Sequence, residues 1–452
     1  MTDSLRSLLE AAASRAATYL EALDERGVSV ADEAMTRLAT LDEPLPDGPT
    51  APETVLALLD EIGSPATVAT AGPRFFGFVI GGSVPAALAA NWLAGAWDQN
   101  AGLWAASPIG AKTEEVALRW LLDVLGLPTG ACGAFVTGAT MANFTALAAA
   151  RHAVLRRVGW DAESDGLFGA PPITVIVGEE AHPTLFRSLS LLGLGHQRVI
   201  KVPVDGQGRM RADALPKLSG PTIVCTQAGN VNTGSFDPIQ QICEQAHQIN
   251  AWVHVDGAFG LWASATPGRA HLTVGVSSAD SWATDAHKWL NVPYDSGLAF
   301  VRDPDMLRAA LRLTAAYLPQ GDMREPSQFT PELSRRARGV EVWAALRSLG
   351  RSGIADLIER NCRFATRFAQ GLRAAGYPIL NDVVLNQVLV SFGNPDRTRQ
   401  VIAAIQRDGT CWCGPTVWQG QTAMRISVSS WATTEADVEN SLAAMMRVAV
   451  QG

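Results

Sequence analysis

The chain has 452 residues, of which 47% are hydrophobic and 18% charged, and its formal net charge is -8. This length and balance give enough apolar material for a large core spread over about two to four domains, and they exclude a largely disordered protein. The net negative charge disfavours a nucleic-acid partner, because binding to phosphates needs a basic surface. We therefore expect a protein that acts on small molecules.

The six cysteines are scattered, and the chain is far larger than disulfide-stapled domains, so we expect a reducing, cytoplasmic setting. Cys411 and Cys413 have no histidines near them, which favours buried thiols over metal ligands, and we expect no metal. Residues 1–23 mix acidic and apolar residues at helical spacing and lack the segments of a secretory leader. The apolar run from Ala86 is interrupted by Asn91 and is too short to cross a bilayer, so we expect no membrane partner.

Three parts are predicted along the chain. A Pro- and Asp-rich stretch from Leu41 separates an N-terminal helix from the rest, and we assign residues 1–75 to a helical arm. In residues 76–345, helical patterns alternate with short apolar runs, a pattern typical of an α/β domain whose mainly parallel sheet is covered by helices on both faces. The runs are centred near Phe135, Val175, Val199, Val224, Val253 and Trp282, and a further strand follows Lys288.

The C-terminal part begins with a different pattern. A long helix is predicted from Gly339, and short strands follow near Val388 and Ile426. This combination indicates a smaller α+β domain, to which we assign residues 346–452. In parallel sheets, ligands bind beyond the carboxyl ends of the strands, so the residues that close each apolar run are the candidates for a site.

Lys288 is the first of these candidates. It lies in TDAHKWLNVPYDSG, among apolar and aromatic neighbours and directly after the run DSWATD. A solvated surface lysine is the ordinary alternative. In an apolar cleft, desolvation favours the neutral amine, which can attack a carbonyl and form an imine. We interpret Lys288 as a nucleophile of this kind.

Asp256 and the turn at Gly138 supply two further signals. Asp256 closes the apolar run HVD, where a buried charge needs a partner. It either caps the following helix or faces a pyridinium nitrogen and keeps it protonated. In FVTGATMANFTALAAAR, Gly138 makes a tight turn before a helix from about Thr140, whose N–H groups and dipole would hold a phosphate. Many α/β connections share this pattern without binding anything.

Taken together, these segments resemble the group II pyridoxal-phosphate-dependent amino-acid decarboxylases, which include aromatic-amino-acid, histidine and glutamate decarboxylases. LWAASPIGAKTEEVALRWLLDVLGLP, VTGATMANFTAL, EEAHPTLFRSL, NVNTGSFDPI, HVDGAFG and DAHKWLNVPYDSG occur in the family's order, over about residues 74 to 350. The resemblance implies an aspartate aminotransferase-like fold (the type I PLP-dependent transferase fold) with a mainly parallel seven-stranded sheet. It also implies pyridoxal 5′-phosphate (PLP) as cofactor and a homodimer whose partner is wrapped by the arm, residues 1–75.

The resemblance also assigns roles to single residues. It implies that Lys288 holds the cofactor as a Schiff base, that Asp256 pairs with the pyridine nitrogen and that the imidazole of His182 stacks on the ring. Tyr317, in LTAAYLPQGD, matches the tyrosine of a mobile loop that protonates the substrate carbon after CO2 leaves; a packing aromatic is the alternative. Further cofactor contacts implied by the resemblance are Ala139, Thr140, Gln227, Ala258, Asp285 and His287.

Asp285 and Ala286 depart from the family pattern, in which many members have Asn-Pro before His-Lys. An ionised Asp285 would be repelled by a phosphate dianion, so either the phosphate is held differently or Thr284 and main-chain groups replace the missing contact. The segment FGFVIGGSVPAA is also one residue shorter than its counterpart in the aromatic-acid enzymes, where that segment lines the substrate pocket. These departures affect phosphate binding and substrate choice.

The reaction implied by the resemblance is decarboxylation of an L-amino acid to the amine and CO2, with an aromatic substrate favoured. Phe76, Phe78, Trp92, Trp97 and Trp104 fall in the segments that shape the family's pocket entrance, although core packing explains some of them. An acidic substrate would need a basic group, for which Arg74, Arg335 and Arg425 are candidates. An aldehyde-forming oxidative decarboxylase and an aminotransferase on the same fold are further alternatives.

Overall fold

The computed structural model describes residues 2–217, 219–312 and 323–451. The chain forms two compact units. The first comprises Met1–Gly82, Arg367–Leu380 and Leu389–Gly452, and the second comprises Ser83–Thr366 and Asn381–Val388. The predicted division into residues 1–75, 76–345 and 346–452 stays a prediction.

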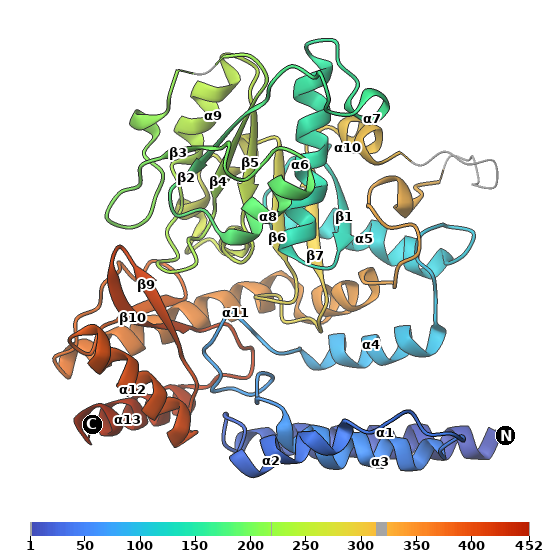
Figure 1. Ribbon diagram of the computed structural model, residues 1–452, viewed down its shortest axis with the longest axis vertical. Helices are drawn as coiled ribbons and strands as arrows, with labels where there is room; N and C mark the ends of the chain where they lie inside the picture. The colour runs from blue at the N-terminus through green and yellow to red at the C-terminus, as the bar shows by residue number, and fades with distance from the viewer. Residues whose placement is uncertain (1, 218, 313–322, 452) are drawn as a thin grey trace. The chain divides into compact units, whose positions relative to one another are not determined.

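A seven-stranded sheet forms the centre of the second unit (Figure 1). Its strands follow the order β1-β7-β6-β5-β4-β2-β3, in which β6, β5, β4, β2 and β3 are parallel while β7 runs antiparallel to both β1 and β6. The predicted mainly parallel sheet is therefore confirmed. The strands are β1 Cys132–Val136, β2 Thr174–Gly178, β3 Ile200–Val202, β4 Thr222–Gln227, β5 Trp252–Asp256, β6 Ser281–Asp285 and β7 Gly297–Val301.

The central strands are apolar on both faces because both faces are buried. Every residue of β4, β5, β6 and β7 is buried, as expected for strands that helices cover on each side. Helix α6, Ala139–Arg156, packs against β5, β6 and β7 (Figure 1). The other helices that lie in this unit are α4 Pro85–Trp97, α5 Pro108–Val124, α7 Ala162–Asp165, α8 Pro183–Leu191, α9 Ile239–His247 and α10 Pro304–Leu311.

The long helix predicted from Gly339 is interrupted. Helix α11 spans Gly339–Ala374, but Gly350 within it has φ 59 and ψ -178. These angles are non-helical, and φ lies where glycine is strongly favoured. The pattern of apolar residues continues across this point, so periodicity alone predicts one continuous helix.

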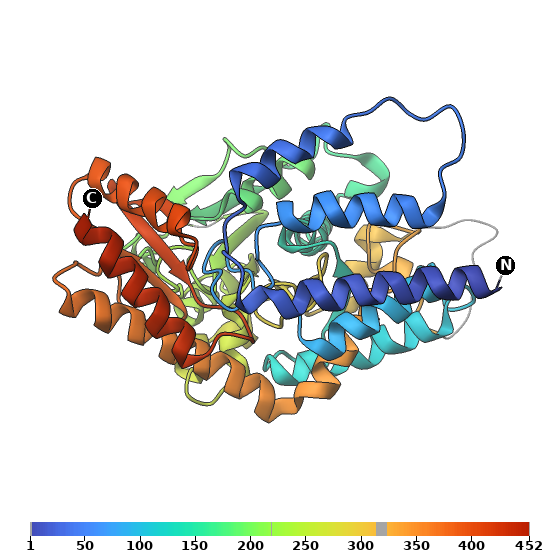
Figure 2. The ribbon, with the colours of Figure 1, turned by 90° about the horizontal axis from the view of Figure 1, so that it is seen from below.

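The first unit combines helices with a small sheet. Its sheet has the order β8-β10-β9, with β9 and β10 antiparallel. Helices α1 and α3 lie side by side (Figure 2), and Arg15 of α1 pairs with Asp60 of α3 at 2.6 Å. The elements are α1 Thr2–Glu21, α2 Asp32–Arg37, α3 Pro52–Gly63, α12 Pro395–Asp408, β9 Gly414–Trp418, β10 Gln421–Ser427 and α13 Glu435–Gln451, together with the last two residues of β8 Gln387–Val390. Within the described part of the chain, no helix is both long enough and apolar enough to cross a membrane.

Candidate active site

The residues predicted at the strand ends lie at one edge of the seven-stranded sheet. β4, β5 and β6 end at Gln227, Asp256 and Asp285, and Gln227 is in register with Asp256. Gly297, the first residue of β7, pairs with Asp285 on one side and with Val136, the last residue of β1, on the other. The carboxyl ends of the parallel strands therefore bring these residues to the edge where ligands bind in sheets of this kind.

Helix α6 starts at the same edge. Gly138 precedes it in an extended conformation, and no side chain among the residues that the structure describes caps the helix. The N–H groups of Ala139 and Thr140 have no intrahelical acceptor, and the positive end of the helix dipole favours an anion there. A Cβ built on Gly297 would lie 2.4 Å from the Cα of Gly138, so β7 and this turn approach each other too closely for any side chain. A residue larger than glycine at 297 would displace the helix start.

Asp256 is tied to the same helix. Its side chain is buried, and both carboxylate oxygens accept hydrogen bonds. The Ala258 N–H donates to Oδ1 at 3.2 Å, and Asn143 Nδ2 donates to Oδ2 at 3.1 Å. Because Asn143 lies near the start of α6, the second bond fixes the end of β5 against the open end of the helix.

Lys288 has a charged partner. Its Nζ lies 3.0 Å from Asp285 Oδ2, and the two side chains are 20% and 2% exposed. The other oxygen of Asp285, Oδ1, is buried and has no hydrogen-bond partner in the part of the chain that the structure describes. The sequence pattern, which places Lys288 among apolar neighbours, did not predict this ion pair.

His287 faces Asp285 as a neutral ring. The Ser296 N–H donates to His287 Nδ1 at 3.0 Å, which assigns the ring proton to Nε2. Nε2 lies 3.7 Å from Asp285 Oδ1, and the ring stacks on Tyr294 with 4.3 Å between centroids. Burial lowers the pKa of His287, and the nearby charge of Asp285 opposes that shift.

A family assignment follows from a match over most of the chain. The pyridoxal-dependent decarboxylase conserved domain matches residues 36–392. The chain belongs to this family. The protein is a PLP-dependent amino-acid decarboxylase, which is a carboxy-lyase, and its cofactor is pyridoxal 5′-phosphate. The predicted family, cofactor and enzyme class are confirmed.

Relatives of this decarboxylase act on different amino acids. Tryptophan decarboxylase 1 of Oryza sativa subsp. japonica is 28% identical over 402 residues, or 80% of this chain and 77% of that protein. Acidic amino acid decarboxylase GADL1 of Mus musculus is 29% identical over 308 residues, or 65% of this chain and 55% of that protein. The crystal structure of Oryza sativa TDC with PLP and tryptamine has a TM-score of 0.91 at 23% identity, covering 100% of this chain and 98% of that one. This likeness confirms the predicted aspartate aminotransferase-like fold.

The residues at the sheet edge fit the chemistry of PLP. The uncapped start of α6 suits a phosphate, the carboxylate of Asp256 suits a protonated pyridine nitrogen, and the amine of Lys288 suits an aldehyde. Contacts join the three parts: Asn143 links α6 to Asp256, and a Cβ built on Gly138 would lie 3.6 Å from Asp285 Oδ1. The decarboxylase therefore has the donor and acceptor set that its cofactor needs at one edge of one sheet.

His182 and Gln227 occupy the other side of this edge. His182 precedes α8, and its Nδ1 lies 2.7 Å from Thr184 Oγ1 and accepts the Thr184 N–H at 3.4 Å. Gln227 is buried, and its Nε2 donates to the carbonyl of Glu180 at 3.2 Å. The structure thus places both residues at or just beyond the ends of β2 and β4. Their contacts with the cofactor stay predictions.

Tyr317 and Thr284 were also predicted to take part in the site. Tyr317 lies outside the described residues. Thr284, the alternative phosphate contact, has its hydroxyl 3.4 Å from the carbonyl of Ala258 and is fully buried. Its hydroxyl already has an acceptor, which disfavours Thr284 as the group that replaces Asp285.

Two buried polar residues beside Asp256 were not predicted from the sequence. Asn143 and His254 are both fully buried, and His254 Nε2 lies 2.8 Å from Asn143 Oδ1. The position of His254 could have been predicted, because it stands two residues before Asp256 in HVD and alternate residues of a strand lie on the same face. No comparable signal exists for Asn143, because its position depends on how α6 docks on the sheet.

His254 makes a testable contribution to the pH dependence of stability. Burial lowers its pKa from 6.5 to about 4, against the opposing charge of Asp256. The unfolded chain takes up this proton near pH 6.5 and the folded chain only near 4, so stability present above pH 6.5 is lost as the pH falls to about 4. The loss is about 3 kcal/mol. Urea unfolding at pH 7 and pH 4.5 should therefore show a smaller pH effect in His254→Gln than in the wild type, and equal effects would contradict the buried neutral histidine.

Two of the three arginines considered for an acidic substrate already have partners. Arg335 is almost fully buried and pairs with Glu114 at 2.7 Å. Arg74 pairs with Asp437 at 3.4 Å and donates to a main-chain carbonyl at 2.9 Å. Arg425 is partly buried on β10, burial lowers its pKa, and its side chain makes no hydrogen bond or ion pair with the residues for which the structure gives positions. Of the three, Arg425 remains the candidate.

The aromatic residues considered for the pocket differ in burial. Phe76 is buried and packs edge-on against Phe368, with 5.0 Å between centroids, which explains it as a core residue. Phe78, Trp92 and Trp97 are 61%, 45% and 42% exposed. Core packing therefore does not account for these three side chains.

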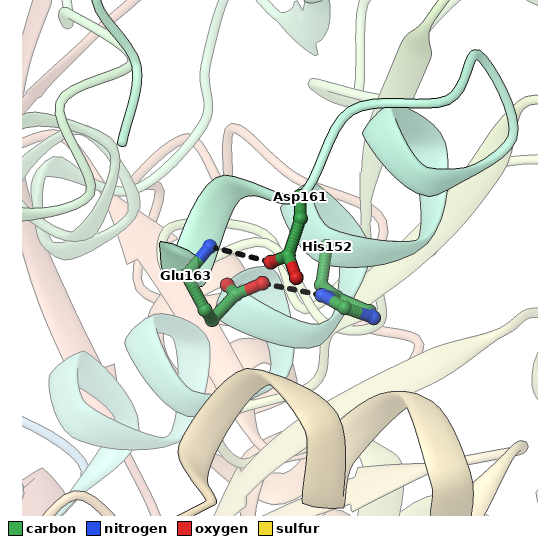
Figure 3. Close-up of side chains that lie close together, drawn as sticks. All are labelled: His152, Asp161 and Glu163. Carbon is green, nitrogen blue, oxygen red and sulfur yellow. Dashed lines mark hydrogen bonds and ion pairs between the residues drawn. The ribbon is translucent and has the colours of Figure 1, made fainter. Parts of the chain in front are cut away.

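A cluster of potential metal ligands lies elsewhere in the second unit (Figure 3). It consists of His152, Asp161 and Glu163. Asp161 Oδ1 caps helix α7 by accepting the N–H groups of Glu163 and Ser164 at 3.1 and 3.2 Å. Glu163 pairs with His152 and, at 3.2 Å, with Arg151. The carboxylates thus serve as a helix cap and as partners for a histidine and an arginine, which accounts for their lying close together.

Proposed function

We propose that this decarboxylase converts an aromatic L-amino acid to the corresponding amine and CO2. One observation carries the proposal: Asp256 ends β5, and Lys288 follows the neighbouring strand β6, at the edge where α6 starts without a side-chain cap from Gly138. An aromatic substrate is favoured over an acidic one because Arg74 and Arg335, two of the three arginines considered, already form ion pairs, which leaves Arg425 as the one candidate of the three for an acidic substrate.

The side chains at this edge have distinct roles in the proposal. When bound, PLP supplies a protonated pyridine ring that withdraws the electron pair left on the substrate α-carbon as CO2 departs. Asp256 holds the proton at the ring nitrogen. The N–H groups of Ala139 and Thr140 bind the phosphate, His182 lies against the ring, and Lys288 attaches the cofactor through Nζ. Gln227 and Ala258 contact the ring or its substituents.

Asp285 positions the side chain of Lys288 in this proposal. Its Oδ2 lies 3.0 Å from Nζ, so the carboxylate would hold the amine where the cofactor aldehyde would bind. The ion pair offsets the negative charge of Asp285, which would otherwise repel the phosphate dianion. His287 Nε2 lies 3.7 Å from Asp285 Oδ1 and makes no hydrogen bond to it.

Tyr317 completes the reaction in the proposal. After CO2 leaves, its hydroxyl returns a proton to the substrate α-carbon. This assignment depends on the resemblance in LTAAYLPQGD. Decarboxylation unchanged in Tyr317→Phe would contradict it.

A screen of the 20 common L-amino acids for CO2 and amine release tests the proposed substrate. The expected result is turnover of an aromatic amino acid, with one amine formed for each CO2. Turnover of glutamate or aspartate alone would replace the proposal with an acidic-substrate enzyme. Oxygen uptake with ammonia release would indicate an aldehyde-forming enzyme, and stoichiometric pyridoxamine phosphate an aminotransferase.

We also propose a cytoplasmic homodimer. All six cysteines are free thiols, which suits a reducing compartment. Leu5 and Leu9 of α1, and Trp92, Leu93 and Trp97 of α4, are exposed apolar side chains of the kind that a second copy would cover. Light scattering should give the mass of two chains, and a monomer at micromolar concentration would contradict the dimer.

A further inference from the structure

A row of buried polar side chains leads away from Asp256 into the core. Trp252, His254 and Asp256 alternate along β5, so their side chains share one face of the sheet. Ser281 of β6 is in register with His254, and Asn143 of α6 lies over the same face. All five residues are at least 95% buried. Polar groups removed from water to this extent must satisfy one another.

Four hydrogen bonds connect the row. Trp252 Nε1 donates to Ser281 Oγ at 2.8 Å, and Ser281 Oγ lies 2.9 Å from His254 Nδ1. His254 Nε2 lies 2.8 Å from Asn143 Oδ1. Asn143 Nδ2 donates to Asp256 Oδ2 at 3.1 Å. The row therefore runs without a break from an indole N–H to a carboxylate.

When His254 is neutral and Asp256 is ionised, the donors and acceptors of the row fit together in only one direction. The indole N–H can only donate, and an ionised carboxylate can only accept. Because the Asn143 amide N–H points to Asp256, its Oδ1 must accept from His254, which assigns the proton of His254 to Nε2. Nδ1 of His254 then accepts the hydroxyl proton of Ser281. Every bond is thus polarised toward Asp256, and neighbouring bonds in such a chain strengthen one another.

We propose that Asn143, His254 and Ser281 are positioning residues for decarboxylation, because they keep Asp256 ionised and aimed at the ring nitrogen of the cofactor. The inference deepens the proposed function and rests on the role given there to Asp256. The row stabilises the carboxylate without a formal positive charge, so the protonated ring nitrogen does not compete with a second cation. Burial lowers the pKa of His254, and the other titratable neighbour, Cys225 of β4 in register with His254, has its thiol pKa raised by burial.

The first test uses the wild-type holoenzyme labelled with 15N-histidine. Two-bond 1H–15N spectra should show His254 as the neutral Nε2–H form, unchanged from pH 5.5 to 9, with the signal assigned by its loss in His254→Gln. A His254 that carries its proton on Nδ1, or that titrates near pH 6.5, would overturn the proposal. This readout does not depend on catalytic turnover, so its failure is distinct from failure of the proposed substrate.

The second test interrupts the row. His254→Gln can still accept from Ser281 and donate to Asn143, whereas His254→Leu and Asn143→Leu cannot. In holoenzyme loaded with ring-15N PLP, the two leucine variants should shift the ring-nitrogen signal toward the unprotonated form and raise the PLP dissociation constant about tenfold, and the glutamine variant should restore both.

Thr145→Val is a matched control for these variants. Thr145 is a fully buried residue of α6 whose hydroxyl makes no hydrogen bond to the described residues. Its replacement should leave the ring-nitrogen signal and the PLP dissociation constant at their wild-type values. A folded His254→Leu enzyme with wild-type values for both would overturn the proposal.

Discussion

Replacing Lys288 by Ala should lower kcat for decarboxylation by more than about a thousandfold. The substitution removes the amine that attaches the cofactor and leaves Asp285, which lies 3.0 Å from Nζ in the wild type, without its ion-pair partner. The visible absorbance of lysine-bound cofactor should disappear at the same time. Spectra and single-turnover rates of PLP-loaded protein measure the two effects separately.

Lys112→Ala provides the matched control. Lys112 is exposed on α5 and pairs with Glu115 at 3.1 Å, and such surface pairs contribute little to stability. This variant should keep wild-type turnover and absorbance. If Lys288→Ala retains steady turnover, or if both variants lose activity equally, Lys288 does not have the assigned role.

Replacing Asp256 by Asn should lower kcat by about 10² to 10³-fold while the cofactor still binds. The amide has the same shape, and its oxygen can still accept the Ala258 N–H, which donates to Oδ1 at 3.2 Å. It has no charge to keep the ring nitrogen protonated, and its NH2 group would face the donating Nδ2 of Asn143. Single-turnover decarboxylation in saturated PLP isolates this loss from any change in cofactor affinity.

Asp280→Asn tests whether another carboxylate beside the same strands would behave in the same way. Asp280 directly precedes β6, at the edge opposite Asp256, and its Oδ2 accepts the Val253 N–H at 2.8 Å. An asparagine oxygen can still accept that bond, so turnover should stay within about twofold of the wild type. An Asp256→Asn enzyme with more than half of wild-type kcat would exclude the proposed electronic role.

Periodicity and strand-end chemistry predicted the large sheet well. The apolar runs near Phe135, Val224 and Val253 form strands that are buried on both faces. A strand of this kind is apolar at nearly every position, so its residue types alone predict it. Parallel strands end at one edge of a sheet, which is why Asp256 and Asp285 lie on the same side.

Features that depend on docking could not be predicted from the sequence. The bond between Asn143 and Asp256 requires the register of α6 on the sheet, which no local pattern specifies. The pairing of Lys288 with Asp285 depends on how the chain turns after β6. The interruption of helix α11 at Gly350 could not be predicted, since a glycine inside a helical pattern is often tolerated.

The central claim is that Lys288 holds PLP at the end of β6. Borohydride reduction of the holoenzyme, followed by peptide mass spectrometry, tests it most directly, because reduction fixes the cofactor to the amine that holds it. We predict a phosphopyridoxyl group on the peptide that contains Lys288 and on no peptide that contains Lys112, Lys201 or Lys217. A label on any of those three lysines with none on Lys288 would contradict the account.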